Sequence, residues 1–231
     1  MTISGRRAAG RFTATHHALL FAWMARAVID RVGKERGEAV ILEAVRRYGE
    51  ERGHRMALRA EADGEPLSTA NYLAYGEWSA NPGETEQTIV EQGADVRMTV
   101  QRCPWHAAWA ENDLMAYGRL YCLEIDEALV RGFNAALRLD VACTRPNDSK
   151  SCEFVFHGVG KRVPRHGRVM PWAYHVGHLY KTVGDVMVEE MGPVGREAAR
   201  EALDPFAQRY GEEAAEVVLA YRDVDFGQLP E

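Results

Sequence analysis

Three short segments of the chain carry paired reactive side chains. The pairs are Cys103 with His106, Cys122 with Asp126, and His175 with His178. A thiol near an imidazole can ionise to a nucleophilic thiolate, and a carboxylate can orient a histidine or accept a proton. Two histidines three residues apart share a helical face and can bind a metal or supply a general base. We therefore expect the six side chains to converge on one pocket.

The nucleophile that these residues imply can be supplied in two ways. His175 and His178, with His106 as the third ligand, would hold zinc or manganese and activate a bound water. Alternatively, Cys103 or Cys122 would attack as a thiolate. Each pair also has a purely structural interpretation, because helical cysteines usually pack in cores and neighbouring histidines can simply share hydrogen bonds. We favour the thiolate, because three dispersed histidines rarely meet by chance.

Aromatic and basic side chains flank the reactive segments. We expect Trp105 or Trp172 to wall a pocket for a flat ring. The Gly/Pro-rich loop 158–171 is basic, and its arginines, such as Arg168, would capture a substrate carboxylate. The full expected binding set is Trp105, Tyr121, Asn134, Arg168, Trp172 and Tyr174.

The hydrophobic periodicity around these segments predicts helices, a hairpin, helices, a second hairpin and more helices. Residues 13–62 have the spacing of two helices or one interrupted helix, with Thr13 or Thr15 as the N-cap. Period-two alternation near 86–103 and 137–157 predicts two hairpins. Residues 63–84 form a long connection with aromatic patches, of a length that often carries function. Helices are expected at 105–117 and 120–131, joined at Gly118, and then at 172–191 and 195–220. The pattern predicts a single α+β domain with a mostly antiparallel sheet of about four strands.

Composition narrows the class of protein. The chain has 231 residues, 46% of them apolar, and a net charge of −6. These values exclude a disulfide miniprotein, a coiled-coil rod and wholesale disorder. The acidic balance speaks against nucleic acid as a partner, and no apolar run is long enough to cross a bilayer. Four cysteines without a C-x-x-C pair indicate a reducing, cytoplasmic setting. The helical face of Leu20, Trp23 and Met24 predicts a homo-oligomer, if it is exposed.

The order of the motifs is more specific than any single motif. R-C-P-W-H, Y-C-x-x-x-D, G-F-N, C-x-F-x-F and Y-H-x-x-H-L-Y follow one another between residues 102 and 180. This order resembles the L-2-amino-thiazoline-4-carboxylic acid hydrolase family over about residues 20–205, most strongly over 102–156. Two features differ from the family pattern: Ala135 stands where proline often follows G-F-N, and the basic loop is longer.

The resemblance implies hydrolytic opening of a C–N bond in a small heterocycle, of the cyclic amidine, imide or lactam type. The implied substrates are small molecules, including ones that bear a carboxylate. A fainter resemblance reaches the four-vinyl-reductase-like small-molecule-binding domains, which are α+β. A binding module without catalysis is therefore the alternative function.

Overall fold

The computed structural model describes residues 10–143, 151–161, 163–164 and 169–230. These residues fall into two compact units between which the chain passes repeatedly. Unit 1 comprises Met1–Tyr48, Pro104–Tyr121 and Met170–Val224, and unit 2 comprises Gly49–Cys103, Cys122–Val169 and Asp225–Glu231. The expected single domain stays a prediction.

Unit 1 is built from helices. They are α2 (Ala14–Val32), the first part of α3 (Lys34–Ala62), α5 (Pro104–Glu111), most of α6 (Met115–Cys122), α8 (Trp172–Met191), α9 (Pro193–Glu201), α10 (Leu203–Tyr210) and α11 (Glu212–Leu219). The predicted N-cap holds, because α2 begins directly after Thr13. Gly33, with φ of 82°, separates α2 from α3, in a left-handed conformation that glycine adopts without strain.

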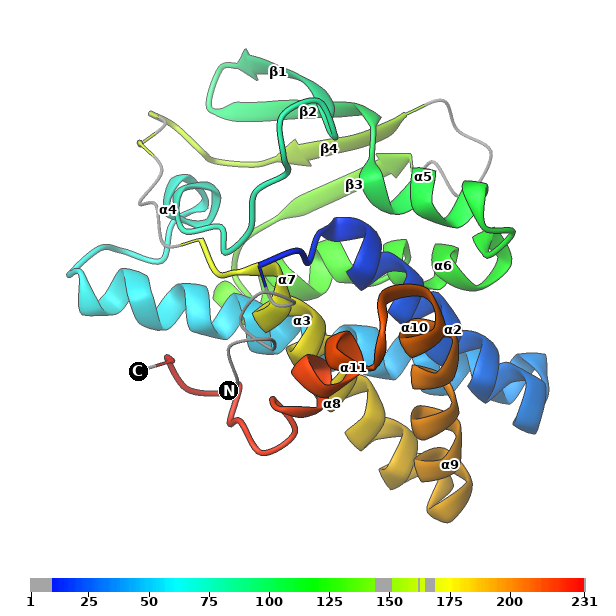
Figure 1. Ribbon diagram of the computed structural model, residues 1–231. Coiled ribbons are helices and arrows are strands. Elements are labelled where there is room, and N and C mark those ends of the chain that lie inside the picture. Colours follow the sequence, from blue (N-terminus) through cyan, green and yellow to red (C-terminus); the bar gives the residue numbers. More distant parts are fainter. Residues whose placement is uncertain (1–9, 144–150, 162, 165–168, 231) are drawn as a thin grey trace. The chain divides into compact units, whose positions relative to one another are not determined.

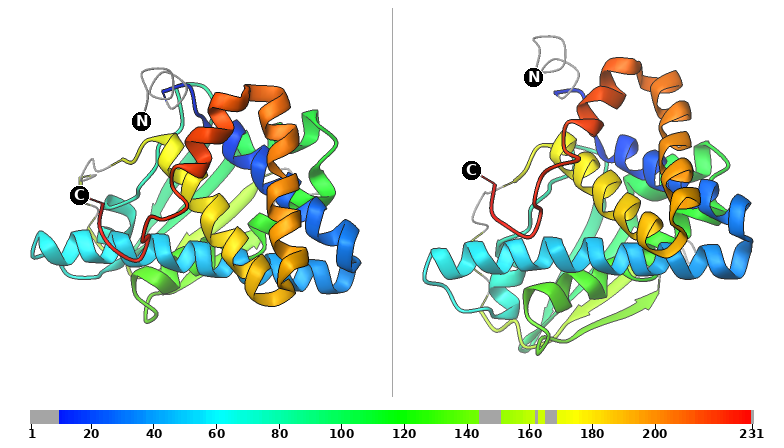
Figure 2. Two further views of the ribbon diagram at one scale, coloured as in Figure 1. Left: turned by 60° about the horizontal axis from the view of Figure 1, so that its bottom comes forward. Right: turned by 90° about the horizontal axis from the view of Figure 1, so that it is seen from below.

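Helix α2 lies at the centre of unit 1. Helices α5, α8, α9 and α10 all contact it, and Figure 2 shows the helices from α8 onward, yellow to red, folding back beside the blue α2. Leu20 and Met24 are therefore fully buried, and Trp23 is 8% exposed. The expectation that this face is exposed was wrong, since neighbouring helices of the same chain cover it.

Three predicted helical stretches, 105–117, 120–131 and 195–220, are divided more finely than expected. The helix at 105–117 ends early because Asp113 adopts a left-handed φ of 55° between α5 and α6. Gly118 lies inside α6 rather than at a joint, and a Cβ there would overlap the Trp109 ring. The last predicted helix is three helices, α9 to α11, with Gly211 at φ 93° before α11.

Unit 2 contains the sheet (Figure 1). Its strands are β1 (Glu86–Gln92), β2 (Asp95–Arg102), β3 (Leu139–Cys143) and β4 (Cys152–Phe156), in the order β1-β2-β4-β3 with all neighbours antiparallel. Both predicted hairpins are confirmed, and so is the α+β class. The turn expected at 146–148 lies outside the described residues.

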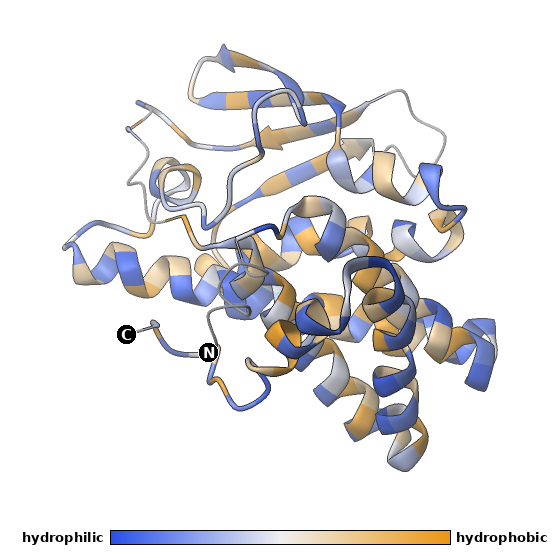
Figure 3. Ribbon diagram, viewed as in Figure 1, coloured by the Kyte–Doolittle hydropathy of each residue, from blue (hydrophilic) through white to orange (hydrophobic). Residues whose placement is uncertain are grey.

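The inner face of the sheet forms the core of unit 2. Phe154 and Phe156 alternate with outward residues on β4 and are 7% and 5% exposed, and Cys152 packs with them as predicted. Figure 3 shows the matching alternation of hydrophobic and hydrophilic colour along the strands. A strand covered on one face requires this period of two.

The helices of unit 2 are the second part of α3, the short α4 (Thr69–Ala74) and α7 (Ile125–Phe133). Helices α3 and α7 approach closely at Gly49, Gly53 and Gly132, where a Cβ would overlap backbone or side-chain atoms of the other helix. This close packing fixes the positions of the two helices relative to each other, and both helices carry polar side chains of the pocket in unit 2. None of the described helices has the length and apolarity needed to cross a membrane.

Candidate functional site

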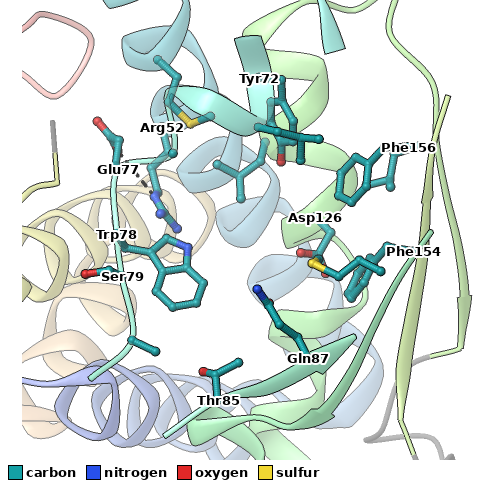
Figure 4. Close-up of a pocket in the computed structure, with 17 residues that line it drawn as sticks. Arg52, Tyr72, Glu77, Trp78, Ser79, Thr85, Gln87, Asp126, Phe154 and Phe156 are labelled. Carbon is teal, nitrogen blue, oxygen red and sulfur yellow. Dashed lines mark ion pairs between the residues drawn. The ribbon is translucent and has the colours of Figure 1, made fainter. Parts of the chain in front are cut away.

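A pocket of about 450 Å³ lies within unit 2. Side chains of α3, α4 and α7 line it together with the segment 76–80 and the inner face of the sheet (Figure 4). The lining residues that carry its chemistry are Arg52, Tyr72, Glu77, Trp78, Gln87 and Asp126. The volume is that of a site for a small molecule.

Aromatic rings form two sides of the pocket. In Figure 4, Trp78 lies on the side opposite Phe154 and Phe156, and the Gln87 amide points into the space between them. Phe154 and Phe156 stack with centroids 6.4 Å apart, and Tyr72 lies 6.0 Å from Phe156. Burial raises the pKa of Tyr72, helped by the negative charge of Asp126, so its hydroxyl stays protonated. Such walls suit a flat ring with one polar edge.

A buried cluster of three arginines and one glutamate adjoins the aromatic walls. Arg55 binds the Glu77 carboxylate with two hydrogen bonds of 3.0 and 2.9 Å, and Arg59 adds one of 2.6 Å. Arg52 Nε lies 3.6 Å from Glu77 Oε2. Arg55 also donates to the Phe226 carbonyl at 2.6 Å. Arg55 and Arg59 thus have a structural role. Of the three arginines, Arg52 lines the pocket.

The cluster concentrates positive charge. Three guanidinium groups surround the Glu77 carboxylate, in side chains that are at most 4% exposed. Buried positive charge is costly unless negative charge balances it. Asp126 supplies part of this balance, because the charge of Arg52 lowers its pKa. The pocket therefore favours an anionic group near Arg52.

Asp126 is the titratable group of the pocket suited to proton transfer. Burial raises its pKa from 3.8 to about 6, with the charge of Arg52 acting in the opposite direction. A carboxyl group that titrates near neutral pH can both accept and release a proton during a reaction. Of the six residues predicted to be catalytic, Asp126 is the one in the lining of this pocket.

The Cys122 thiol lies close enough to Asp126 for the carboxylate charge to affect its pKa. Cys122 and Asp126 were expected on one helix, but Cys122 ends α6 and Asp126 belongs to the first turn of α7. Burial raises the pKa of the Cys122 thiol well above its usual value, and the charges of Asp126, Cys103 and Cys152 add to the effect. Cys122 is therefore a neutral thiol at neutral pH, and both Cys103 and Cys122 are half-buried.

Unit 1 contains a second polar cluster, in which several predicted residues meet. Trp105 Nε1–H donates to His17 Nδ1 at 3.0 Å, and the opposite ring nitrogen of His17 lies 3.0 Å from the Tyr48 hydroxyl. An acceptor Nδ1 fixes His17 as the neutral tautomer that donates from Nε2. Tyr121 and Trp172 pack edge-on against the His17 ring, with centroids 5.4 and 6.2 Å away.

The two predicted histidines of α8 adjoin this cluster. His175 and His178 are 1% and 0% exposed, and the His178 ring lies 4.5 Å from that of Tyr48. The backbone carbonyl of His175 accepts a long hydrogen bond of 3.5 Å from the Tyr48 hydroxyl. Tyr174 lies 6.0 Å from the His175 ring. The cluster is buried and extensively hydrogen-bonded.

The remaining predicted residues have separate positions. His106 is half-buried on α5 in unit 1. The amide of Asn134 donates to the Leu67 carbonyl at 2.8 Å and its oxygen accepts from Ala136 N–H at 3.0 Å, which is a structural role at the end of α7. Arg168 lies outside the described residues. Convergence of the six predicted catalytic residues on one pocket stays a prediction.

Metal-ligating side chains form no closed set in the part of the chain that the structure describes. Within it, no group of three or more His, Cys, Asp or Glu residues is placed to hold a metal ion. His106, His175 and His178 accordingly make no such group as they stand. A metal at these histidines would need a different arrangement of their side chains.

The sequence analysis did not identify Arg52, Glu77 and Gln87. One signal was present, because Arg52, Arg55 and Arg59 recur on one face of a helix that also carries apolar residues. The connection 63–84 was expected to carry function, and it supplies Tyr72, Glu77 and Trp78 to the pocket.

Comparisons with known proteins give one match. A family model described as L-2-amino-thiazoline-4-carboxylic acid hydrolase matches residues 13–156. Searches of curated proteins and of solved structures find no match. The matched range includes α2, both hairpins and every described side chain in the lining of the unit 2 pocket.

Proposed function

The chain belongs to the L-2-amino-thiazoline-4-carboxylic acid hydrolase family, and we propose that it opens a C–N bond of a small carboxylate-bearing cyclic amidine in the unit 2 pocket. The observation that carries this proposal is that Arg52 and Asp126, whose pKa burial raises to about 6, line the same pocket between aromatic walls. One group suits an anion and the other suits proton transfer. Cyclic imides and lactams are the neighbouring substrate types.

The substrate would bind through one positively charged and one negatively charged side chain of the pocket. The carboxylate of the substrate pairs with Arg52, beside the cluster of guanidinium groups. The amidine is basic and pairs with the Asp126 carboxylate. The flat ring lies between Trp78 and the phenylalanines of β4, so that both charged ends are held at once.

In the reaction, water adds across the C–N bond. Asp126 accepts a proton as the oxygen of water bonds to the ring carbon, which forms a tetrahedral intermediate. The ring C–N bond then breaks, and Asp126 returns the proton to the leaving nitrogen. Oxygen ends on carbon and hydrogen on nitrogen, so no other reactant is consumed. Tyr72, whose hydroxyl stays protonated, is available as a hydrogen-bond donor to the developing negative charge.

Two other sources of the nucleophile remain as proposals. One is a Cys103 thiolate, since the raised pKa of Cys122 keeps that thiol neutral. The other is water on a zinc or manganese ion bound by His106, His175 and His178. Cys103→Ala and chelation distinguish these two routes from attack by a water molecule that Asp126 activates.

A substrate panel tests the proposed function. Purified protein is assayed with cyclic amidines that bear or lack a carboxylate, and with hydantoins and cyclic imides, with product formation followed by mass spectrometry. The proposal expects turnover of the carboxylate-bearing amidine at the highest kcat/KM of the panel. Saturable binding with no product from any compound would overturn it and favour the non-catalytic binding module.

A further inference from the structure

The Thr85 hydroxyl oxygen is a buried polar atom in the lining of the unit 2 pocket, directly before β1 (Glu86–Gln92). It has no hydrogen-bond partner in the part of the chain that the structure describes. Buried hydroxyl groups are nearly always hydrogen-bonded, because a buried polar atom left unmatched costs free energy. The partner of Thr85 is therefore expected to come from a molecule that occupies the pocket.

Gln87 on β1 supplies a second polar group from the same part of the chain. Gln87 lies opposite Val100 of β2, and Val100 lies opposite Cys152 of β4. Directly opposed residues of neighbouring strands share a face of the sheet, and Val100 and Cys152 both pack in the apolar core of unit 2. Gln87 is therefore a polar residue on the inner face of the sheet, where the pattern of a half-covered sheet calls for an apolar one.

The Gln87 amide is available to a ligand. It points into the space between Trp78 and the phenylalanines of β4 (Figure 4), and none of the described residues forms a hydrogen bond with it. A carboxamide presents an N–H donor beside a C=O acceptor in one plane. The complementary ligand edge has an acceptor beside a donor, as in the amide of a lactam or imide or the neutral form of an amidine. A carboxylate has acceptors only, so it matches Arg52 better than Gln87.

We propose that Gln87 and Thr85 determine the specificity of the pocket and select heterocycles with an unsubstituted ring nitrogen, in which N–H lies beside C=O or C=N. The Gln87 amide accepts from the ring N–H and donates to the neighbouring acceptor atom, and the Thr85 hydroxyl donates to that same atom. An analogue without the N–H leaves the Gln87 oxygen unmatched, which a hydrogen-bonding site disfavours. This inference rests on the ring position given in the proposed function, and it concerns binding rather than the chemical step.

Calorimetric titration with two matched probes tests the selection. The probes are the lactam pyroglutamate and its lactone analogue, which share the carboxylate and the ring carbonyl and differ in having N–H or oxygen in the ring. We expect wild-type protein to bind the lactam at least about 10-fold more tightly, because the lactone loses one hydrogen bond and places its ring oxygen against the Gln87 amide. In Gln87→Met, which keeps the side-chain length without polar groups, the two affinities should agree within about twofold.

Two further variants separate the roles of the two residues. Thr85→Val should weaken both probes equally, by about threefold to tenfold, because it removes a donor to the carbonyl that they share. Gln101→Met is the control, since the Gln101 amide donates to Thr88 and does not line the pocket; it should keep the wild-type preference. Circular dichroism verifies that each variant is folded.

Three results would overturn the inference: equal wild-type affinities for the two probes, no saturable binding of either probe, or a Gln87→Met variant that keeps the wild-type preference. The failure of the proposed function would look different. A protein that prefers the lactam through Gln87, yet forms no product from any compound of the substrate panel, would refute catalysis and support the role of Gln87 in binding.

Discussion

Replacing Asp126 with asparagine should stabilise the protein in a pH-dependent way. Burial raises the pKa of Asp126 from 3.8 to about 6, so the folded state holds a proton that the unfolded state has released. Between these values the free energy of unfolding falls as pH rises, because the folded state binds more protons. The difference corresponds to about 3 kcal/mol, since a tenfold change in proton affinity is about 1.4 kcal/mol.

Urea unfolding at pH 4 and pH 7 measures this difference. Near pH 4 we expect Asp126→Asn to be more stable than wild type by only about 0.6 kcal/mol, because the carboxyl group is protonated in the folded state and about four-tenths protonated in the unfolded state. At pH 7 the variant should be more stable by about 3 kcal/mol. Glu127→Gln, an exposed neighbour on α7, is the control and should change stability by less than about 0.5 kcal/mol. A stability gain equal at the two pH values would refute the assignment of a raised pKa to Asp126.

Three further changes address binding and the nucleophile. Arg52→Met should raise KM for carboxylate-bearing substrates by about 10- to 100-fold, which corresponds to the loss of about 1.5–3 kcal/mol for one charge-assisted contact. The control Arg131→Met, which removes an exposed ion pair, should leave KM unchanged. Equal effects of the two substitutions would contradict the role of Arg52. Cys103→Ala should abolish turnover if the thiolate acts and leave it within about threefold if water does, and Cys122→Ala should remain active because its thiol is neutral. Activity that survives exhaustive chelation, with metal content measured, would eliminate the metal-water route.

The fold was largely predictable because it depends on local periodicity. Alternation within 86–103 and 137–157 identified the strands and their hairpin partners, which the structure pairs as expected. Helix boundaries were less predictable. The break at Asp113 depends on one residue with a left-handed φ, and Gly118 is required by packing against Trp109 rather than by a turn.

The pocket was less predictable than the fold because its chemistry depends on contacts between distant segments. Arg52 and Glu77 are 25 positions apart in the sequence, and neither local segment indicates that the Glu77 carboxylate lies buried beside Arg52. The pKa of Asp126 likewise results from burial, which the sequence pattern does not display. Paired reactive residues were easier to notice, and they led to Asp126 but not to its partners.

The measurement that tests the central claim most directly is the pH dependence of kcat/KM for a carboxylate-bearing cyclic amidine, in wild type and in Asp126→Asn. If Asp126 is the base, kcat/KM of wild type rises with pH through an inflection near 6. The variant, still folded, should lose that inflection and at least about 100-fold in kcat. A variant that retains the wild-type rate and profile would contradict catalysis by Asp126 in this pocket.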